Sequence, residues 1–229
     1  MHFALLKIYY RLRFIKRKLK IKTYKVRKKL KPAWKKSRFR IIMLLLFGLA
    51  IQQLGQGSYI YAKAIFSQYL IDSAWQKTLQ GQDEVKPWSW ADTWPVAKLT
   101  SKKHHTKLFI LAGDNGRTLA FGPGYRFGTE LPGGMGTSVI SGHRDTHFSF
   151  LQDVQLLDEF EIQNKEGEVL KYRVSDTKVI SIDEGFKIED DSSSKITLVT
   201  CYPFNSIISD GNLRYIVTAK KLEMLLANQ

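Results

Sequence analysis

Acidic side chains are absent from the first 71 residues of this 229-residue chain, and Asp72 is the first of them. Residues 1–40 hold 17 Lys and Arg, whereas residues 41–229 hold 19 basic and 21 acidic side chains. The formal net charge of +15 therefore belongs to a basic tail, and the rest of the chain is nearly neutral. This division argues against a nucleic-acid-binding body, because such a domain spreads its basic residues over a folded face.

Cysteine is the second scarce residue, since Cys201 is the only one. A single thiol excludes an intramolecular disulfide and a multi-cysteine metal site. Cys201 ends the run "KITLVTC", whose alternate residues are typical of the two faces of a β-strand. Pro203 stops the strand, because proline lacks the N–H that a central ladder needs. A thiol at a strand end is explained either by burial or by catalysis.

Charge of either sign is absent from residues 41–62, "IIMLLLFGLAIQQLGQGSYIYA". A helix of these 22 residues spans roughly 33 Å, close to a hydrocarbon core of ~30 Å. We therefore predict a transmembrane anchor at 41–62 after a cytoplasmic tail at 1–40, with the rest exported, because basic flanks stay in the cytoplasm. A signal peptide cleaved near Ala62-Lys63-Ala64 is the alternative. The long basic region favours a retained anchor.

The tail interleaves aromatic and basic residues, as in "YYRLRFIKRKLKIKTYKVRKKLKPAWKKSRFR". Contact with nucleic acid is one interpretation of this pattern. Adsorption to anionic lipids of the cytoplasmic leaflet is favoured, because the tail lies directly beside the predicted span. We therefore expect membrane lipids, and no nucleic acid, as partners of the tail.

Residues 63–98 are predicted to form a helical stalk followed by a linker rich in tryptophan and proline. Apolar residues recur at helical spacing between Lys63 and Gln80; they are Ile65, Tyr69, Ala74, Trp75 and Leu79. Residues 81–100 carry two prolines and three tryptophans, which predicts an irregular segment. We expect it to pack on the following domain as a lid does, with a ligand-stacking surface as the alternative.

From Lys107 onward, short alternating runs are separated by turn residues. Asp114-Asn115-Gly116 predicts a hairpin between "KLFILAG" and "TLAFGPG", and "FSFLQDVQLL" predicts one short helix. About eight strands without a repeated βαβ unit predict an all-β barrel or sandwich. We place this domain at residues 99–229.

Three residues lie at strand ends where they can meet. His143 ends "SVISGH" as Cys201 ends "KITLVTC", and Arg214 begins the last strand, "LRYIVTAKKL". Acyl transfer by cysteine needs this set, because the thiolate attacks, an imidazole protonates the leaving amine, and a cation steadies the oxyanion. Among the other histidines, His104 and His105 are expected to be solvated and His2 lies in the tail.

These residues resemble the signature of a known family. "TLVTC" followed by Arg214 resembles the Thr-Leu-x-Thr-Cys strand and following arginine of sortases, and "SGHRDTHF" is similar to their histidine segment. The segments "CYPF", "GHRDTHF" and "KPWSWADTWPVAKL" resemble the corresponding segments of sortases from Gram-negative, largely marine bacteria.

The resemblance implies an eight-stranded β-barrel transpeptidase with short helices behind a transmembrane helix. Cys201 would attack the Thr–Gly carbonyl of a Leu-Pro-x-Thr-Gly-like sorting signal, His143 would act as acid and base, and Arg214 would steady the oxyanion. Thr200 matches the signature threonine and would line the substrate site. The implied partners are a substrate protein with a C-terminal sorting signal and an amine acceptor.

The same resemblance places the anchor in the inner membrane and the catalytic domain on its periplasmic side. No cofactor or metal is expected, because the lone cysteine and scattered histidines lack ligand spacing. The run "DEGFKIEDD" is interpreted as an acidic surface loop rather than a calcium site. Arg144, Asp145 and His147 are interpreted as local loop structure.

Two alternatives stay open at this point. The first is a hydrolase that uses the same residues with water as acceptor, and the second is a non-catalytic membrane-anchored barrel with Cys201 as core filler. A murein-type cysteine transpeptidase of another fold is disfavoured, because no glycine precedes Cys201 and no arginine follows within two residues.

Overall fold

The computed structural model describes residues 2–185, 193–206 and 211–222. The chain divides into two compact units, residues 1–62 and residues 63–229. Helix α1 (His2–Leu79) runs through the first unit into the second. Within it, Ser37–Leu79 contains an exposed 18-residue window with a mean hydropathy of 1.5. This one helix is long and apolar enough to cross a membrane, as the predicted anchor requires.

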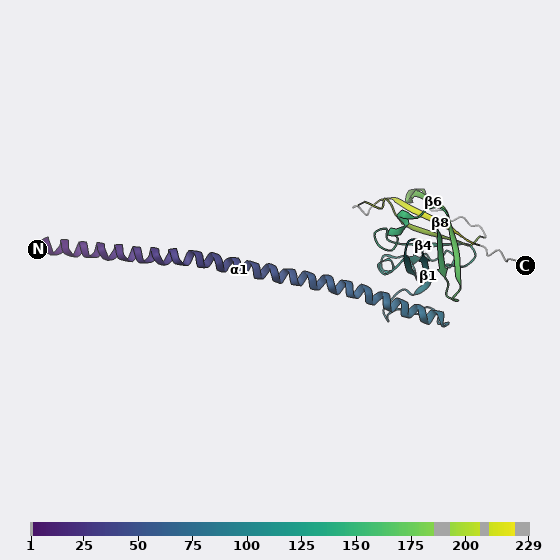
Figure 1. The fold of residues 1–229 in the computed structure, drawn as a ribbon, viewed down its shortest axis with the longest axis horizontal. Coiled ribbons are helices and arrows are strands. Elements are labelled where there is room, and N and C mark those ends of the chain that lie inside the picture. The colour runs from purple at the N-terminus through teal and green to yellow at the C-terminus, as the bar shows by residue number, and fades with distance from the viewer. Residues whose placement is uncertain (1, 186–192, 207–210, 223–229) are drawn as a thin grey trace, which may run out of the picture. The chain divides into compact units, whose positions relative to one another are not determined.

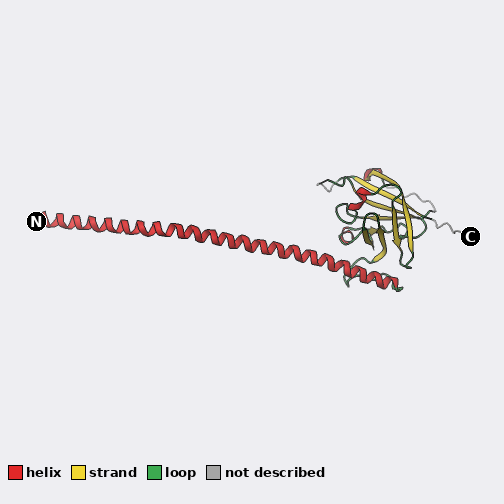
Figure 2. Ribbon diagram, in the orientation of Figure 1, coloured by secondary structure: helices red, strands yellow, loops and turns green. Residues whose placement is uncertain are grey.

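The second unit contains the β-strands, which form a closed barrel (Figures 1 and 2). The strands follow the order β1-β2-β3-β4-β7-β8-β6-β5 around the barrel. The barrel predicted from the sequence is confirmed. The eight strands among the described residues are β1 (Pro95–Ser101), β2 (Thr106–Ala112), β3 (Gly124–Tyr125), β4 (Thr137–Ser141), β5 (Glu159–Gln163), β6 (Val169–Ser181), β7 (Lys195–Cys201) and β8 (Leu213–Lys221). The short helices described between the strands are α2 (Gly116–Leu119), η1 (Ser149–Asp153) and η2 (Ile182–Glu184). The short helix expected within "FSFLQDVQLL" is the 3₁₀ helix η1.

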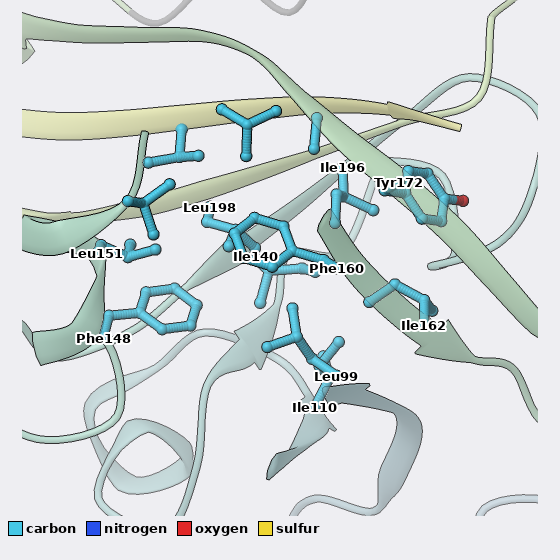
Figure 3. Close-up of a cluster of buried hydrophobic side chains, with 14 of the residues drawn as sticks. Leu99, Ile110, Ile140, Phe148, Leu151, Phe160, Ile162, Tyr172, Ile196 and Leu198 are labelled. Carbon is cyan, nitrogen blue, oxygen red and sulfur yellow. The ribbon is translucent and has the colours of Figure 1, made fainter. Parts of the chain in front are cut away.

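The barrel encloses an apolar core, part of which is shown in Figure 3, and each of the eight described strands contributes at least one side chain to it. Apolar side chains meet there from strands far apart in sequence, such as Leu99 of β1, Ile140 of β4 and Leu198 of β7. Phe148, directly before η1, and Leu151, within η1, pack into the same cluster. Burial of this apolar surface supplies the main favourable free energy of folding.

The predicted hairpin through Asp114-Asn115-Gly116 is wrong. The Asn115 side chain accepts hydrogen bonds from the backbone N–H groups of Arg117 and Thr118 at 3.0 and 3.1 Å, so it caps α2 instead of turning a hairpin. The chain then returns as β3, which pairs with β2 in parallel. Gly124 makes this pairing possible, because a Cβ there would lie 2.2 Å from the carbonyl oxygen of Gly113.

Residues 81–100 are not irregular throughout, because β1 begins at Pro95 and pairs with both β2 and β5. Packing of the tryptophans is confirmed for two of the three. Trp88 contacts Phe121 edge to face with ring centroids 4.9 Å apart, and Trp94 contacts Phe127 at 6.5 Å. Trp90 differs, since it is 83% exposed.

The helix predicted over residues 63–80 is confirmed up to Leu79, and its buried face matches the expected one at Ala74 and Trp75 only. Ile65 and Tyr69 are exposed, and the side chains buried in the second unit are Ser67, Ile71, Ala74, Trp75 and Thr78. Their spacing follows one side of a helix. Gln68 adds a hydrogen bond from Nε2 to the carbonyl oxygen of Phe121 at 2.7 Å. The end of α1 is therefore part of the folded domain.

Candidate active site

Strand register places His143 beside Cys201. β4 and β7 run parallel with a constant offset of 58 residues, from Thr137 opposite Lys195 to Ser141 opposite Val199. The backbone N–H of Gly142 continues the ladder with a 3.0 Å bond to the carbonyl oxygen of Val199. The same offset puts His143 opposite Cys201, on neighbouring strands that are about 4.8 Å apart.

Arg214 lies on the other side of Cys201. β7 and β8 are antiparallel, and Cys201 and Arg214 are the last pair of their ladder. The sequence therefore predicted correctly that the final strand returns to the thiol. The order of strands is β4, β7 and β8, so the described structure brings His143, Cys201 and Arg214 to adjacent positions at one end of the sheet.

All three positions belong to the outer face of the barrel. Ile140, Leu198 and Val217 point into the core, and side chains alternate along each strand. Cys201 and Arg214 fall on the opposite face from Leu198 and Val217. His143 is exposed and Cys201 is a half-buried free thiol, so a substrate can reach both from the surface.

The residue before each reacting side chain fixes its backbone. Thr200, 2% exposed, donates a 2.7 Å hydrogen bond from Oγ1 to the carbonyl oxygen of Gly142. Gly142 is needed there, because a Cβ would lie 2.6 Å from the buried ring of Phe148. The hydroxyl of Thr200 is therefore engaged within the protein. This geometry favours a positioning role over the predicted contact with substrate.

Arg144 is not the local loop residue that the sequence suggested. Its side chain is 5% exposed, and Nη1 and Nη2 donate hydrogen bonds of 2.8 and 2.7 Å to the carbonyl oxygens of Pro203 and Ser206. These acceptors lie 59 and 62 residues away, in the β7–β8 loop directly after Cys201. No sequence motif signals such a contact, because its acceptors are backbone atoms that every residue carries.

The guanidinium of Arg214 is held by its own loop. Nη1 donates to the carbonyl oxygens of Gly211 and Leu213 at 2.7 and 2.9 Å. Within the described residues, the side chains of His143 and Cys201 form no hydrogen bond with each other. Catalytic contacts of this kind commonly tighten only when substrate binds.

Two further histidines differ in outcome. His147 lies in the turn after β4, in agreement with its interpretation as loop structure; it is half-buried, and burial lowers its pKa, with a smaller contribution from His143. The expectation that His104 is solvated is wrong, because its side chain is 8% exposed and Nε2 lies 2.9 Å from Oδ2 of Asp158. Asp158 is itself buried, which gives His104 a polar partner away from water. His105 is exposed, as expected.

No group of three His, Cys, Asp or Glu side chains that could hold a metal ion occurs among the residues that the structure describes. Most of the acidic run "DEGFKIEDD" lies outside those residues. A cavity of about 690 Å³ lies elsewhere on the second unit, bordered by Trp94, Phe127, Glu130 and Lys165. It is separate from the His143, Cys201 and Arg214 cluster, none of which lines it.

Comparison with known proteins agrees with this geometry. Residues 100–222 match the sortase domain. Over 121 residues the chain is 30% identical to sortase D of Bacillus subtilis (strain 168), an alignment that covers 52% of this chain and 60% of that protein. The chain thus spans about three fifths of that relative's length.

Solved structures share the fold. Sortase A from Corynebacterium diphtheriae is similar with a TM-score of 0.53 at 23% identity, over 71% of this chain and 86% of that one. A sortase D5 transpeptidase from Clostridium perfringens has a TM-score of 0.52 at 23% identity, over 66% and 89%. Because the matched domain takes up more than half of the chain and includes the whole His143, Cys201 and Arg214 cluster, the chain belongs to the sortase family.

Proposed function

We propose that this protein is a membrane-anchored transpeptidase that cleaves a Leu-Pro-x-Thr-Gly-like sorting signal between Thr and Gly and transfers the new Thr end to an amine. The observation that carries the proposal is the register of β4, β7 and β8, which aligns His143, Cys201 and Arg214 on one exposed face. Membership of the sortase family supports the reaction class.

In the first half of the reaction, the Cys201 thiolate attacks the carbonyl carbon of the Thr–Gly bond. The resulting oxyanion lies next to the paired position of Arg214, whose guanidinium supplies N–H donors and positive charge. As the C–N bond breaks, His143 gives its proton to the glycine nitrogen. The products are a free amino terminus and a thioester between Cys201 and the threonine.

In the second half, an amine attacks the thioester carbonyl. His143, now neutral, takes the proton from that amine, and the C–S bond breaks to release Cys201 as thiolate. The acceptor amine becomes linked to threonine through a new amide, and the enzyme returns to its starting protonation state. Water in place of the amine would give hydrolysis with the same residues.

The membrane topology is part of the proposal. The 17 basic residues of the tail support a cytoplasmic N-terminus with the barrel on the exported side. The motifs "CYPF" and "GHRDTHF" support the class of sortases found in Gram-negative bacteria, and a periplasmic barrel is therefore part of the proposal. Protease added to spheroplasts should digest the barrel and spare an epitope on the tail; the reverse pattern would contradict this orientation.

The chemistry is tested with the full-length protein in detergent, a library of Leu-Pro-x-Thr-Gly-type peptides and intact mass measurement. We expect an adduct on Cys201 that ends at threonine and is absent from Cys201→Ala, which keeps its fold. His143→Ala should lower turnover by about 10²–10⁴-fold and Arg214→Ala by about 10²–10³-fold. Undiminished turnover in Cys201→Ala would overturn the proposal.

A second measurement separates transfer from hydrolysis. A primary amine is added at increasing concentration, and the ligated and cleaved products are quantified. Transfer predicts that ligated product replaces cleaved product as amine rises. Cleaved product alone at every amine concentration would identify the hydrolase alternative.

A further inference from the structure

Arg144 joins the segment that carries His143 to the segment that follows Cys201. It comes directly after His143, and its two terminal nitrogens bond the carbonyl oxygens of Pro203 and Ser206. Pro203 and Ser206 form one turn, because the backbone N–H of Ser206 donates to the carbonyl oxygen of Pro203 at 3.4 Å. Arg144 thus forms hydrogen bonds with both ends of the turn that begins two residues after Cys201.

A second contact mirrors this one on the other side of the reacting pair. Thr200, directly before Cys201, bonds Gly142, directly before His143. The two segments are therefore tied together both before and after the residues that must meet. The Thr200 contact holds the strand ends in register, and the Arg144 contact holds the chain where it leaves the strands.

The chemistry of the contact requires arginine. A buried guanidinium is costly unless its N–H groups are satisfied, so Arg144, at 5% exposure, depends on these carbonyl oxygens as they depend on it. The guanidinium is a rigid, planar fork that can serve two acceptors at once, whereas a lysine ammonium is a point donor on a flexible stem. Its Nε lies 3.3 Å from Oδ1 of Asp145, which is mostly exposed and provides little stabilisation.

We propose that Arg144 is a positioning residue for the reaction: it fixes the turn Pro203–Ser206 against the His143 segment and so keeps the imidazole and the Cys201 thiol in productive alignment. Arg144 acts through these backbone contacts and does not touch the reacting atoms. The inference rests on the proposed roles of His143 and Cys201. Misalignment of reacting groups by about 1 Å can cost roughly 10²-fold in rate.

The test uses the full-length protein in detergent, with Arg144→Gln and Arg144→Lys as variants and Arg173→Gln as the matched control. Arg173 on β6 is half-exposed and makes one ion pair with Glu159 at 2.7 Å. The melting temperature is measured for each protein. The first readout is the pH profile of Cys201 alkylation, alone and combined with His143→Ala, because the rate reports the thiolate and a nearby imidazolium favours it.

We expect His143→Ala to change the alkylation profile strongly in the wild-type and Arg173→Gln backgrounds and weakly in Arg144→Gln. This non-additivity is what loss of alignment between two coupled groups predicts. With peptide, Arg144→Gln should lower kcat by roughly 10- to 100-fold while KM changes little. Arg144→Lys should recover only part of the loss.

The outcomes distinguish this inference from the proposed function. If His143→Ala has the same effect in Arg144→Gln as in the wild type, the positioning role is wrong, whether or not peptide is turned over. A drop in kcat that follows only the unfolded fraction also overturns it. If the coupling depends on Arg144 but the wild type turns over no peptide, the proposed function fails, whereas the alignment of the His143 imidazole and the Cys201 thiol by Arg144 stands.

Discussion

At the scale of single residues, the site depends on one glycine whose role is steric. Gly142 lies between β4 and His143, with its N–H bonded to Val199 and its carbonyl oxygen bonded to Thr200. The side of Gly142 that would carry a Cβ faces the ring of Phe148, which is fully buried. The position therefore needs glycine because of a close approach in the folded state.

Gly142→Ala is expected to destabilise the protein by about 1–3 kcal/mol, because the new methyl group would lie 2.6 Å from the fully buried ring of Phe148 and the ring or the backbone must shift. It should also lower turnover, since the displaced backbone carries His143. Urea unfolding and peptide turnover measure the two effects. Gly116→Ala serves as control, because nothing lies within 4 Å of its added Cβ. Equal stability of the two variants would contradict the steric argument.

At the scale of secondary structure, the end of α1 belongs to the same compact unit as the barrel. Trp75 is fully buried and Ile71 nearly so, although a helix next to a membrane anchor would be expected to be a solvated stalk. Burial of two such side chains contributes on the order of 1.5–3 kcal/mol each. A fragment of the protein that is meant to be stable should therefore include the end of this helix.

A fragment that begins at Lys63 is expected to be more stable than one that begins at Asp83, by several kcal/mol on the same reasoning. Thermal melting of the two fragments in the same buffer measures the difference. Within the longer fragment, Trp75→Ala should account for much of it, whereas the exposed Tyr69→Ala should change little. Identical melting temperatures for both fragments would show that the helix end is dispensable.

At the scale of the whole molecule, one buried carboxylate links distant parts of the barrel. Asp158 precedes β5, and it accepts hydrogen bonds from Lys103 at 2.6 Å and from the backbone of Gln155 at 3.0 Å, with Nε2 of His104 2.9 Å away. Burial alone would raise the pKa of Asp158. The hydrogen bonds from Lys103, Gln155 and His104 outweigh it and hold the pKa below its ordinary value.

This lowered pKa predicts an acid-dependent stability. The folded protein holds the Asp158 proton less tightly than the unfolded chain does. The ionised carboxylate therefore contributes to the free energy of unfolding, and this contribution is fully present above the unfolded pKa of about 4. It is lost as pH falls through the lower folded pKa. Asp158→Asn should be less stable than the wild type at neutral pH, and the difference should shrink below about pH 4. Urea midpoints between neutral and acidic pH measure this; a constant difference would contradict it.

Features that depend on composition and on local chemistry could be predicted from the sequence alone. Charge-free residues 41–62 predict a membrane helix because the length of an apolar run decides whether it can span a bilayer. The alternation of apolar and polar residues predicts most of the strands. The positions of His143, Cys201 and Arg214 at strand ends identify the candidate site. Each of these signals lies in a short stretch of chain.

Other contacts between distant groups could not be predicted from the sequence, because they form only when the barrel closes. Asn115 caps a helix instead of turning a hairpin because β3 must return parallel to β2, and β1 exists because β2 and β5 offer ladders on both sides. Arg144 donates hydrogen bonds to backbone carbonyl oxygens in the turn after Cys201. Every residue carries such an oxygen, so the sequence does not indicate which ones Arg144 contacts. Such contacts form between segments that come together only in the closed barrel, so no local sequence pattern predicts them.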